Sequence, residues 1–283
     1  MRKKRDLRRI AGISMFSKPK DLAGNSAKAK EHIAHGAETG AKLVLLPELC
    51  ISGMSPDAYT AAIRADDDIL HDLAATAKSL GVAASVGFFE RDGRKRYVSQ
   101  AFLYKGKIAC ISRKIFCCER GGSDGEAFHV VDWDGALVGT LICWDLHFPI
   151  VSRELAKRGA LLILHPSCYS GKERTGTVGG NHNPDSFQTC TRAKDNGSFF
   201  FHLNASGKTV KKGFVCAGNS LLAAPTGGIM ARIDYSPHTE SMMVADIDLE
   251  AARNATSREW MMLEAGRTGL IKHLPGRKNP NPV

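Results

Sequence analysis

The sequence predicts a single α/β domain built from packed layers of helices and strands. Helical and strand patterns alternate along the first two-thirds of the chain, and glycine, proline or Asp-Gly turns separate them. No internal repeat and no linker-like change of composition divides the 283 residues. Such alternation is typical of a layered α/β architecture, and the length suits one large domain. We therefore expect one domain over residues 1–283, with an extended tail over about 274–283.

The predicted elements of the first half follow in a regular order, each with its own local signal. The apolar stretch 10–16 predicts a first strand, helical spacing over 22–40 a helix, and the run 42–46 a short buried strand. A second helix over 66–80 opens with three aspartates, which the positive end of a helix dipole favours. The next predicted strands cover 82–89, 97–104 and 108–114, with Asp92-Gly93 as a hairpin turn.

The second half continues this alternation and then turns to strands alone. An apolar strand over 136–142 precedes a helix over 149–158, in which Pro149 suits the first turn. The remaining predicted elements are a strand over 160–164, a helix over 184–194, a strand over 198–203, a hairpin over 219–233 and a strand over 242–247.

Composition and charge exclude several classes of protein. No apolar run approaches the roughly 18 residues of a membrane span, so we expect no membrane partner. The eight cysteines are scattered and form no Cys-x-x-Cys pair, which argues against a disulfide scaffold or structural zinc and favours a cytoplasmic protein. The net charge of +10 raises the question of nucleic acid, but aromatic residues for base stacking are not interleaved with the basic ones. We expect no nucleic-acid partner.

Cys143 lies where a buried strand ends and a helix is about to begin, within the segment Gly139–Pro149. Free backbone N–H groups and the helix dipole at such a junction favour an anion, so they lower the pKa of a thiol and can bind an oxyanion. A buried cysteine is more often only a small apolar side chain. The junction makes Cys143 the candidate nucleophile, and we expect it to be the most reactive of the eight thiols.

Two other polar residues also stand at the ends of predicted strands. Glu48 follows the apolar run Leu43–Pro47, where a carboxylate is either a satisfied cap or a partly desolvated general base with a raised pKa. Lys114 ends another strand and, taken alone, would be a surface charge. Asp145 and His147 near the cysteine suggest a metal, but no third ligand is suitably spaced, so we expect none.

Together these segments resemble the carbon–nitrogen hydrolase (nitrilase) superfamily over nearly the whole chain. Leu45-Leu-Pro-Glu48 followed by Ser52-Gly-Met resembles the family's first motif, and Arg113-Lys114 its lysine motif. Ile142-Cys-Trp-Asp followed by Phe148-Pro149 is similar to its nucleophile elbow. Secondary family patterns match at Arg192–Asn196, Asn204–Gly207 and Asn219–Gly228. The motifs occur in the family's order and spacing.

The resemblance implies an α-β-β-α sandwich, the nitrilase-like fold, whose protomers pair into a homodimer or larger homo-oligomer without metal or cofactor. It also implies that Cys143 attacks the carbon of an amide or nitrile while Glu48 takes the thiol proton, giving a thioester acyl-enzyme. Lys114 and the backbone N–H of Trp144 would stabilise the oxyanion. We expect Trp144 and His147 at the edge of the substrate pocket.

A second glutamate between the lysine and the cysteine recurs in this family, and two residues here are candidates. We choose Glu119 over Glu126, because Glu119-Arg120 resembles the Glu-Arg that follows the lysine motif in nitrilase-branch members. The short stretch from Lys114 to Glu119 holds Cys117 and Cys118, which is unusual for the family.

The substrate class stays open between amides, N-carbamoyl compounds and nitriles. Cys143-Trp-Asp145 followed by Phe-Pro resembles carbamoyl-amine and amide hydrolases, and the modest length of the chain favours the same side. Glu119-Arg120 points instead toward nitrilases. A non-catalytic or nucleic-acid-binding protein on the same fold is the alternative from a different class.

Overall fold

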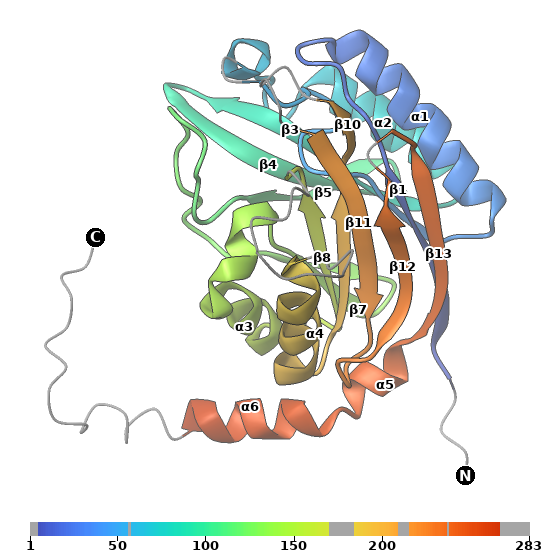
Figure 1. The fold of residues 1–283 in the computed structure, drawn as a ribbon, viewed down its shortest axis with the longest axis vertical. Coiled ribbons are helices and arrows are strands. Elements are labelled where there is room, and N and C mark those ends of the chain that lie inside the picture. Colours follow the sequence, from blue (N-terminus) through green and yellow to red (C-terminus); the bar gives the residue numbers. More distant parts are fainter. Residues whose placement is uncertain (1–4, 56–57, 170–183, 209–214, 237, 267–283) are drawn as a thin grey trace, which may run out of the picture.

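The protein folds as an α-β-β-α sandwich, in which two sheets lie face to face and helices cover the outer side of each (Figure 1). The computed structural model describes residues 5–55, 58–169, 184–208, 215–236 and 238–266. The tail predicted over about 274–283 lies outside these ranges.

The first sheet has the strand order β13-β1-β2-β3-β4-β5. Strands β1, β2 and β3 run parallel, and β4, β5 and β13 join as antiparallel neighbours. Helices α1 (Leu22–Glu38) and α2 (Asp68–Ser79) pack on the outer face. The strands are β1 (Leu7–Ser14), β2 (Leu43–Leu45), β3 (Ala83–Asp92), β4 (Lys95–Tyr104), β5 (Lys107–Arg113) and β13 (Ser241–Asp248).

The second sheet has the order β10-β11-β9-β8-β7-β6, and β12 pairs with β11. Its central strands β7, β8 and β9 are parallel. Helices α3 (Pro149–Lys157) and α4 (Pro184–Asn196) cover it, and α5 (Leu249–Arg253) and α6 (Thr256–Gly266) follow the last strand. The strands are β6 (Val130–Trp133), β7 (Ala136–Thr140), β8 (Leu162–Ser167), β9 (Phe199–Asn204), β10 (Ser206–Lys208), β11 (Val215–Ala223) and β12 (Ile229–Tyr235).

Apolar side chains fill three layers between these elements, and this layering follows from the strand pattern. Leu43 and Leu45 of β2 face the other sheet, whereas Val44 between them faces the helices, as the two-residue period of a strand requires. In β9, Phe199 and Phe201 likewise face the sheet interface while Phe200 faces the helices. No helix among the described residues is both long and apolar enough to cross a bilayer.

The observed elements follow the predicted order, with ends displaced by a few residues. Strand β8 runs to Ser167, beyond the predicted 160–164, because its pairing with β9 continues to Ser167 opposite Asn204. The strands β6 and β10 and the helices α5 and α6 were not predicted. Strands β6 and β10 each pair with the strand that follows in the chain, β7 and β11, and this pairing rather than local hydropathy decides where they form.

Candidate active site

Glu48, Lys114 and Cys143 follow three different strands, and the fold brings them together. Strands β2 and β3 are parallel, and β5 points the same way after two antiparallel reversals, so β2 and β5 end at one edge of the sheet. Strand β7 of the facing sheet leads through Leu141 and Ile142 to Cys143. Each of the three side chains influences the titration of the other two, as expected for a compact cluster.

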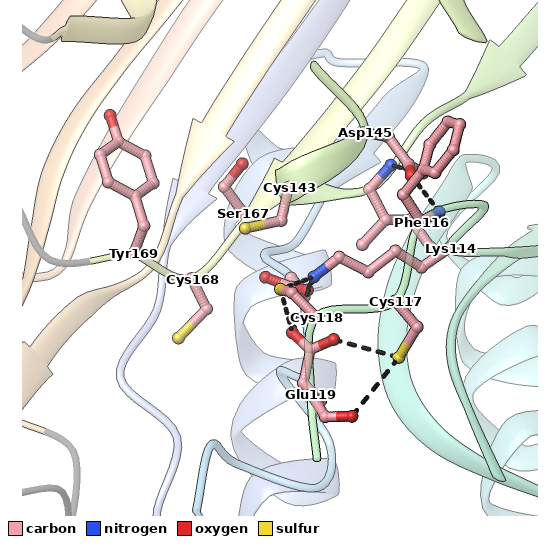
Figure 2. A network of polar contacts seen from close by, with 12 residues as sticks. Lys114, Phe116, Cys117, Cys118, Glu119, Cys143, Asp145, Ser167, Cys168 and Tyr169 are labelled. Carbon is pink, nitrogen blue, oxygen red and sulfur yellow. Dashed lines mark hydrogen bonds and ion pairs between the residues drawn. The ribbon is translucent and has the colours of Figure 1, made fainter. Parts of the chain in front are cut away.

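Lys114 is the centre of a buried row of charges (Figure 2). Its Nζ donates to Glu48 Oε1 at 2.9 Å and to Glu119 Oε1 at 2.7 Å, and its side chain is wholly buried. The backbone of Lys114 is held on both sides, since its N–H donates to Val98 and its carbonyl accepts from Gly125. The lysine that would be a surface charge if taken alone is therefore fixed between two carboxylates.

These three ionisable groups titrate very differently because of their surroundings. Burial raises the pKa of Glu48 to about 7, and Lys114 only partly counteracts this rise. Burial also acts to raise the pKa of Glu119, but Lys114 more than offsets it, and the pKa of Glu119 is lowered. Burial acts to lower the pKa of Lys114, yet the charges of Glu48, Cys143 and Glu119 raise it overall. Lys114 and Glu119 thus stay charged near neutral pH, while Glu48 is able to exchange a proton.

Cys143 begins the short 3-10 helix η2 (Cys143–His147) with a backbone φ of +47°, in the left-handed region. For a residue other than glycine this conformation costs on the order of 1–3 kcal/mol and is typical of functional turns. Burial raises the pKa of the thiol well above its usual value, and the charge of Glu48 adds to that rise. Lys114 and the backbone of Cys168 act in the opposite direction.

The pKa of Cys143 therefore corrects one expectation drawn from the sequence. The strand–helix junction predicts a lowered pKa, but desolvation and the neighbouring carboxylates outweigh the lysine and the Cys168 backbone. Cys143 rests as a neutral thiol beside Glu48, whose Oε2 is buried without a hydrogen bond of ordinary length among the described residues. The arrangement suits proton transfer from the thiol to Glu48 at the moment of attack.

Asp145 ties the elbow around Cys143 to the loop that follows Lys114. Its carboxylate accepts backbone N–H groups from Ile115 at 3.2 Å, Phe116 at 2.9 Å and Ile142 at 3.1 Å (Figure 2 draws the Phe116 bond). Burial raises the pKa of this carboxyl to about 6, although the three hydrogen bonds lower it. The sequence suggested Asp145 as a weak metal ligand and as part of the Cys143-Trp-Asp145 match, but not as a link between two segments. Its position two residues after the cysteine was the available signal, but two of its three partners come from a distant loop.

The two glutamates between Lys114 and Cys143 lie in different surroundings. Glu119 contacts Lys114, and its Oε2 lies 3.3 Å from the Cys117 thiol. Glu126 is exposed and pairs with Lys95 at the surface. The structure thus brings Glu119, and not Glu126, to the charged row.

Cys117 and Cys118 line the same row. The Cys118 thiol is 3.6 Å from Lys114 Nζ, and the Cys117 thiol is 3.7 Å from the Tyr59 hydroxyl. Burial raises the pKa of both thiols to about 11. The short stretch after the lysine therefore packs two neutral thiols against Glu119, a feature that the motifs alone did not reveal.

Trp144 and His147 lie on the exposed side of the elbow. Trp144 is 46% exposed, and its ring meets the His147 ring edge-on with 4.5 Å between centroids. Neither side chain has a hydrogen bond to Glu48, Lys114 or Cys143 in the described part of the chain. Among the described residues, no three His, Cys, Asp or Glu side chains are grouped to hold a metal ion.

Comparison with known proteins agrees with this fold. The model of the Carbon-nitrogen hydrolase family matches residues 9–256. An (R)-stereoselective amidase from a Pseudomonas species is 27% identical, covering 95% of this chain and 97% of the relative. A nitrilase from Pyrococcus abyssi is 28% identical over 87% of this chain and 92% of its own length.

A solved structure of similar fold is an amidase of the nitrilase superfamily from Nesterenkonia, in a mutant form. It superposes with a TM-score of 0.78 at 24% identity, covering 93% of this chain and 97% of that one. At this level of identity the similarity is one of fold: both chains form the α-β-β-α sandwich. The family match spans nearly the whole described sandwich, from β1 to the start of α6. The chain belongs to the carbon–nitrogen hydrolase family and is an enzyme of that family.

Proposed function

We propose that this enzyme hydrolyses a linear amide or an N-carbamoyl compound through a thioester on Cys143. The observation that carries the proposal is the buried row in which Lys114 Nζ bridges Glu48 at 2.9 Å and Glu119 at 2.7 Å beside a neutral thiol. Burying a charged lysine between two carboxylates costs desolvation free energy. The buried cation is, however, suited to stabilising negative charge that forms during a reaction.

In the first half of the reaction, Glu48 takes the proton of the Cys143 thiol as the sulfur attacks the substrate carbon. The new C–S bond pushes the carbonyl π electrons onto oxygen, and Lys114 with the Trp144 N–H stabilises the oxyanion. As the intermediate collapses, the C–N bond breaks and Glu48 returns its proton to the leaving nitrogen. A pKa of about 7 suits Glu48 to both accept and donate that proton.

In the second half, Glu48 takes a proton from water, and the resulting hydroxide adds to the thioester carbon. The C–S bond then breaks, the acid leaves, and Glu48 returns the proton to the thiol. Glu119 touches Lys114 rather than Cys143, so we assign it the role of holding the lysine charged and in place. Trp144 and His147, exposed beside the elbow, are the proposed substrate-contacting residues.

The preference for amides or N-carbamoyl compounds over nitriles rests on the residues after the nucleophile. Cys143-Trp-Asp145 followed by Phe148-Pro149 resembles amide and carbamoyl hydrolases, whereas Glu119-Arg120 leans toward nitrilases. The relatives described above carry both names, amidase and nitrilase. All three reactions use the same core residues, so the pocket around them decides the substrate.

We also propose a homodimer or larger assembly acting in the cytoplasm. Ile150 of α3 is 51% exposed and Phe187 of α4 is 73% exposed, so the helical face over the second sheet presents large apolar side chains. All eight cysteines are free, which suits a reducing compartment. Light scattering at micromolar concentration tests the assembly, and a monomer there contradicts it.

A nucleic-acid-binding protein on the same fold is not favoured. Two arginines near the amino end are engaged with carboxylates: Arg9 with Asp246 at 2.8 Å and Arg8 with Asp6 at 3.0 Å. Paired arginines of this kind leave less positive charge for phosphates.

The test of the proposed function is ammonia release from matched amide, N-carbamoyl and nitrile forms of several side chains. We expect turnover of the amide or carbamoyl series by the native enzyme and none by Cys143→Ala, with Cys110→Ala as the matched control. Cys110 lies on β5 and has no contact with the charged row in the described structure. A tenfold or greater preference in kcat/KM for nitriles, about 1.4 kcal/mol in transition-state binding, overturns the substrate class. Undiminished turnover by Cys143→Ala overturns the mechanism.

A further inference from the structure

Two histidines that the proposed mechanism does not use are buried directly beneath the Cys143 elbow. His165 lies in β8 and His202 in β9, and the parallel register places them opposite each other. Neither is exposed to solvent, and their rings lie 4.6 Å apart between centroids. His165 also meets Phe200 edge-on, which places the pair on the helix-covered face of the second sheet.

The two rings and the nucleophile's backbone form one continuous chain of hydrogen bonds. The Nδ1 atoms of His202 and His165 are 2.8 Å apart, and His165 Nε2 is 3.1 Å from the carbonyl oxygen of Cys143. The Ser167 hydroxyl also approaches His165 Nε2, at 3.0 Å. The chain therefore ends on the main chain of the nucleophile and not on its sulfur, so it is not a Cys–His dyad.

The donor and acceptor needed at each contact determine which nitrogen of each ring carries the proton. A carbonyl oxygen only accepts, so His165 must carry its proton on Nε2 to bond Cys143. Burial lowers the pKa of both histidines, that of His202 to about 3, and each ring therefore carries a single proton. His165 Nδ1 is then an acceptor, and His202 must donate to it from its own Nδ1. This arrangement leaves His202 Nε2 as a buried acceptor without a hydrogen bond of ordinary length among the described residues, although the Asn219 backbone lies close enough to raise the pKa of His202 against the effect of burial.

The bonded carbonyl belongs to the same peptide group as the N–H of Trp144. A peptide group is planar and trans, so its C=O and N–H point in opposite directions. A donor that fixes the Cys143 carbonyl on one side therefore fixes the direction of the Trp144 N–H on the other. The peptide needs such a hold, because Cys143 adopts a φ of +47° that its own side chain disfavours.

We propose that His165, oriented by His202, is a positioning residue that fixes the Cys143–Trp144 peptide and so aims the Trp144 N–H at the developing oxyanion. The inference rests on the proposed function, in which that N–H stabilises the oxyanion. It assigns a role to two buried polar side chains that touch neither the sulfur nor the charged row of Glu48, Lys114 and Glu119.

The first test compares His165→Phe with His165→Gln. Phenylalanine removes the donor to the carbonyl, whereas the glutamine amide offers an N–H at nearly the position of Nε2. We expect His165→Phe to lower kcat about tenfold or more with KM changed less than about threefold, because only the transition state carries the oxyanion. His165→Gln should recover most of the loss. Native kcat in His165→Phe, or equal loss in both variants, overturns the proposal.

The second test separates an effect on the oxyanion from an effect on the thiol. Alkylation of Cys143 by iodoacetamide is a displacement in which no oxyanion forms. We expect its rate in His165→Phe to stay within about threefold of the native rate while kcat falls. An equal fall in both rates means that the pair acts on the sulfur, and it overturns the proposal.

The third test works without any substrate and so stands apart from the proposed function. Nitrogen-15 NMR of labelled histidines reports which ring nitrogen carries the proton. We expect His165 protonated at Nε2 and His202 at Nδ1, each assigned by loss of its signals in His165→Gln and His202→Asn. The opposite tautomer at His165 overturns the inference. If instead the native protein releases no ammonia from any substrate but shows these tautomers, the proposed function fails and the hydrogen-bond chain stands.

Discussion

The Oδ1 atom of Asp145 accepts a 2.9 Å hydrogen bond from the backbone N–H of Phe116, and this bond joins the elbow of Cys143 to the loop of Lys114. The same carboxylate also holds Ile115 and Ile142. Two segments about thirty residues apart in the chain are thereby fixed relative to each other. Asp145 is therefore one of the side chains that fix Cys143 relative to Lys114.

Asp145→Asn should therefore impair catalysis and stability together. The amide replaces one acceptor oxygen by an NH₂ group, which faces a backbone donor and leaves that donor unsatisfied at a cost of about 1–3 kcal/mol. We expect kcat/KM to fall about tenfold or more and the melting temperature to drop. Asp66→Asn is the matched control, because Asp66 is exposed and pairs with the exposed Arg64. Equal behaviour of the two variants in thermal and kinetic assays contradicts the role of Asp145.

Glu48→Gln should lower turnover by about 10² or more while the protein remains folded, because an amide cannot take the thiol proton. Glu119→Gln should also be impaired, since it removes one of the two charges that hold Lys114. Glu126→Gln is the control at the surface. Steady-state ammonia release with circular dichroism checks all three. Loss of activity in Glu126→Gln with normal activity in Glu119→Gln shows that the wrong glutamate was chosen.

Lys114→Ala should lower turnover by about 10² or more, since it removes a proposed oxyanion partner. It also leaves Glu48 and Glu119 buried without their cation, so both carboxyl groups are expected to bind protons more readily. Lys95→Ala is the control, because Lys95 pairs with Glu126 in solvent. Turnover of Lys114→Ala close to that of the control removes the lysine from the mechanism.

The pH dependence of kcat/KM should show an acid limb near pH 7. Glu48 acts as a base only when ionised, and burial raises its pKa to about 7, so activity rises as the pH rises through that value. Below it the carboxyl is protonated and activity is lost. The rate of Cys143 alkylation should follow the same limb, because the same proton transfer precedes attack. An acid limb of kcat/KM near pH 4.5, about the ordinary pKa of a glutamate, contradicts this prediction.

Cys143 should be the thiol that limiting iodoacetamide labels first at neutral pH, as peptide mapping can show. Its raised pKa makes this reactivity depend on Glu48 as the base, so Glu48→Gln should slow the labelling. Cys118 is the internal comparison, since it is exposed and lies beside Lys114, and the carboxylate that it contacts, Glu119, is already paired with that lysine. Faster labelling of Cys117, Cys118 or Cys50 contradicts the assignment of the nucleophile.

The sequence by itself determined the layered fold, the family and the places where polar residues follow apolar strands. Strand periodicity and turn residues are local signals, and they located Glu48 after β2, Lys114 after β5 and Cys143 after β7. The family could be identified from the order of the motifs along the chain, since each motif alone is a weak signal.

Only the tertiary structure decided what surrounds these residues. Glu119 meets Lys114 while Glu126 meets solvent, although both lie in the same interval of the sequence. The pKa of Cys143 rises because desolvation depends on atoms brought from distant strands, which no local pattern contains. For the same reason the partners of Asp145 and the pairing of His165 with His202 were invisible beforehand. Burial and long-range hydrogen bonds are properties of the packed sandwich, and they set the chemistry of the candidate site residues.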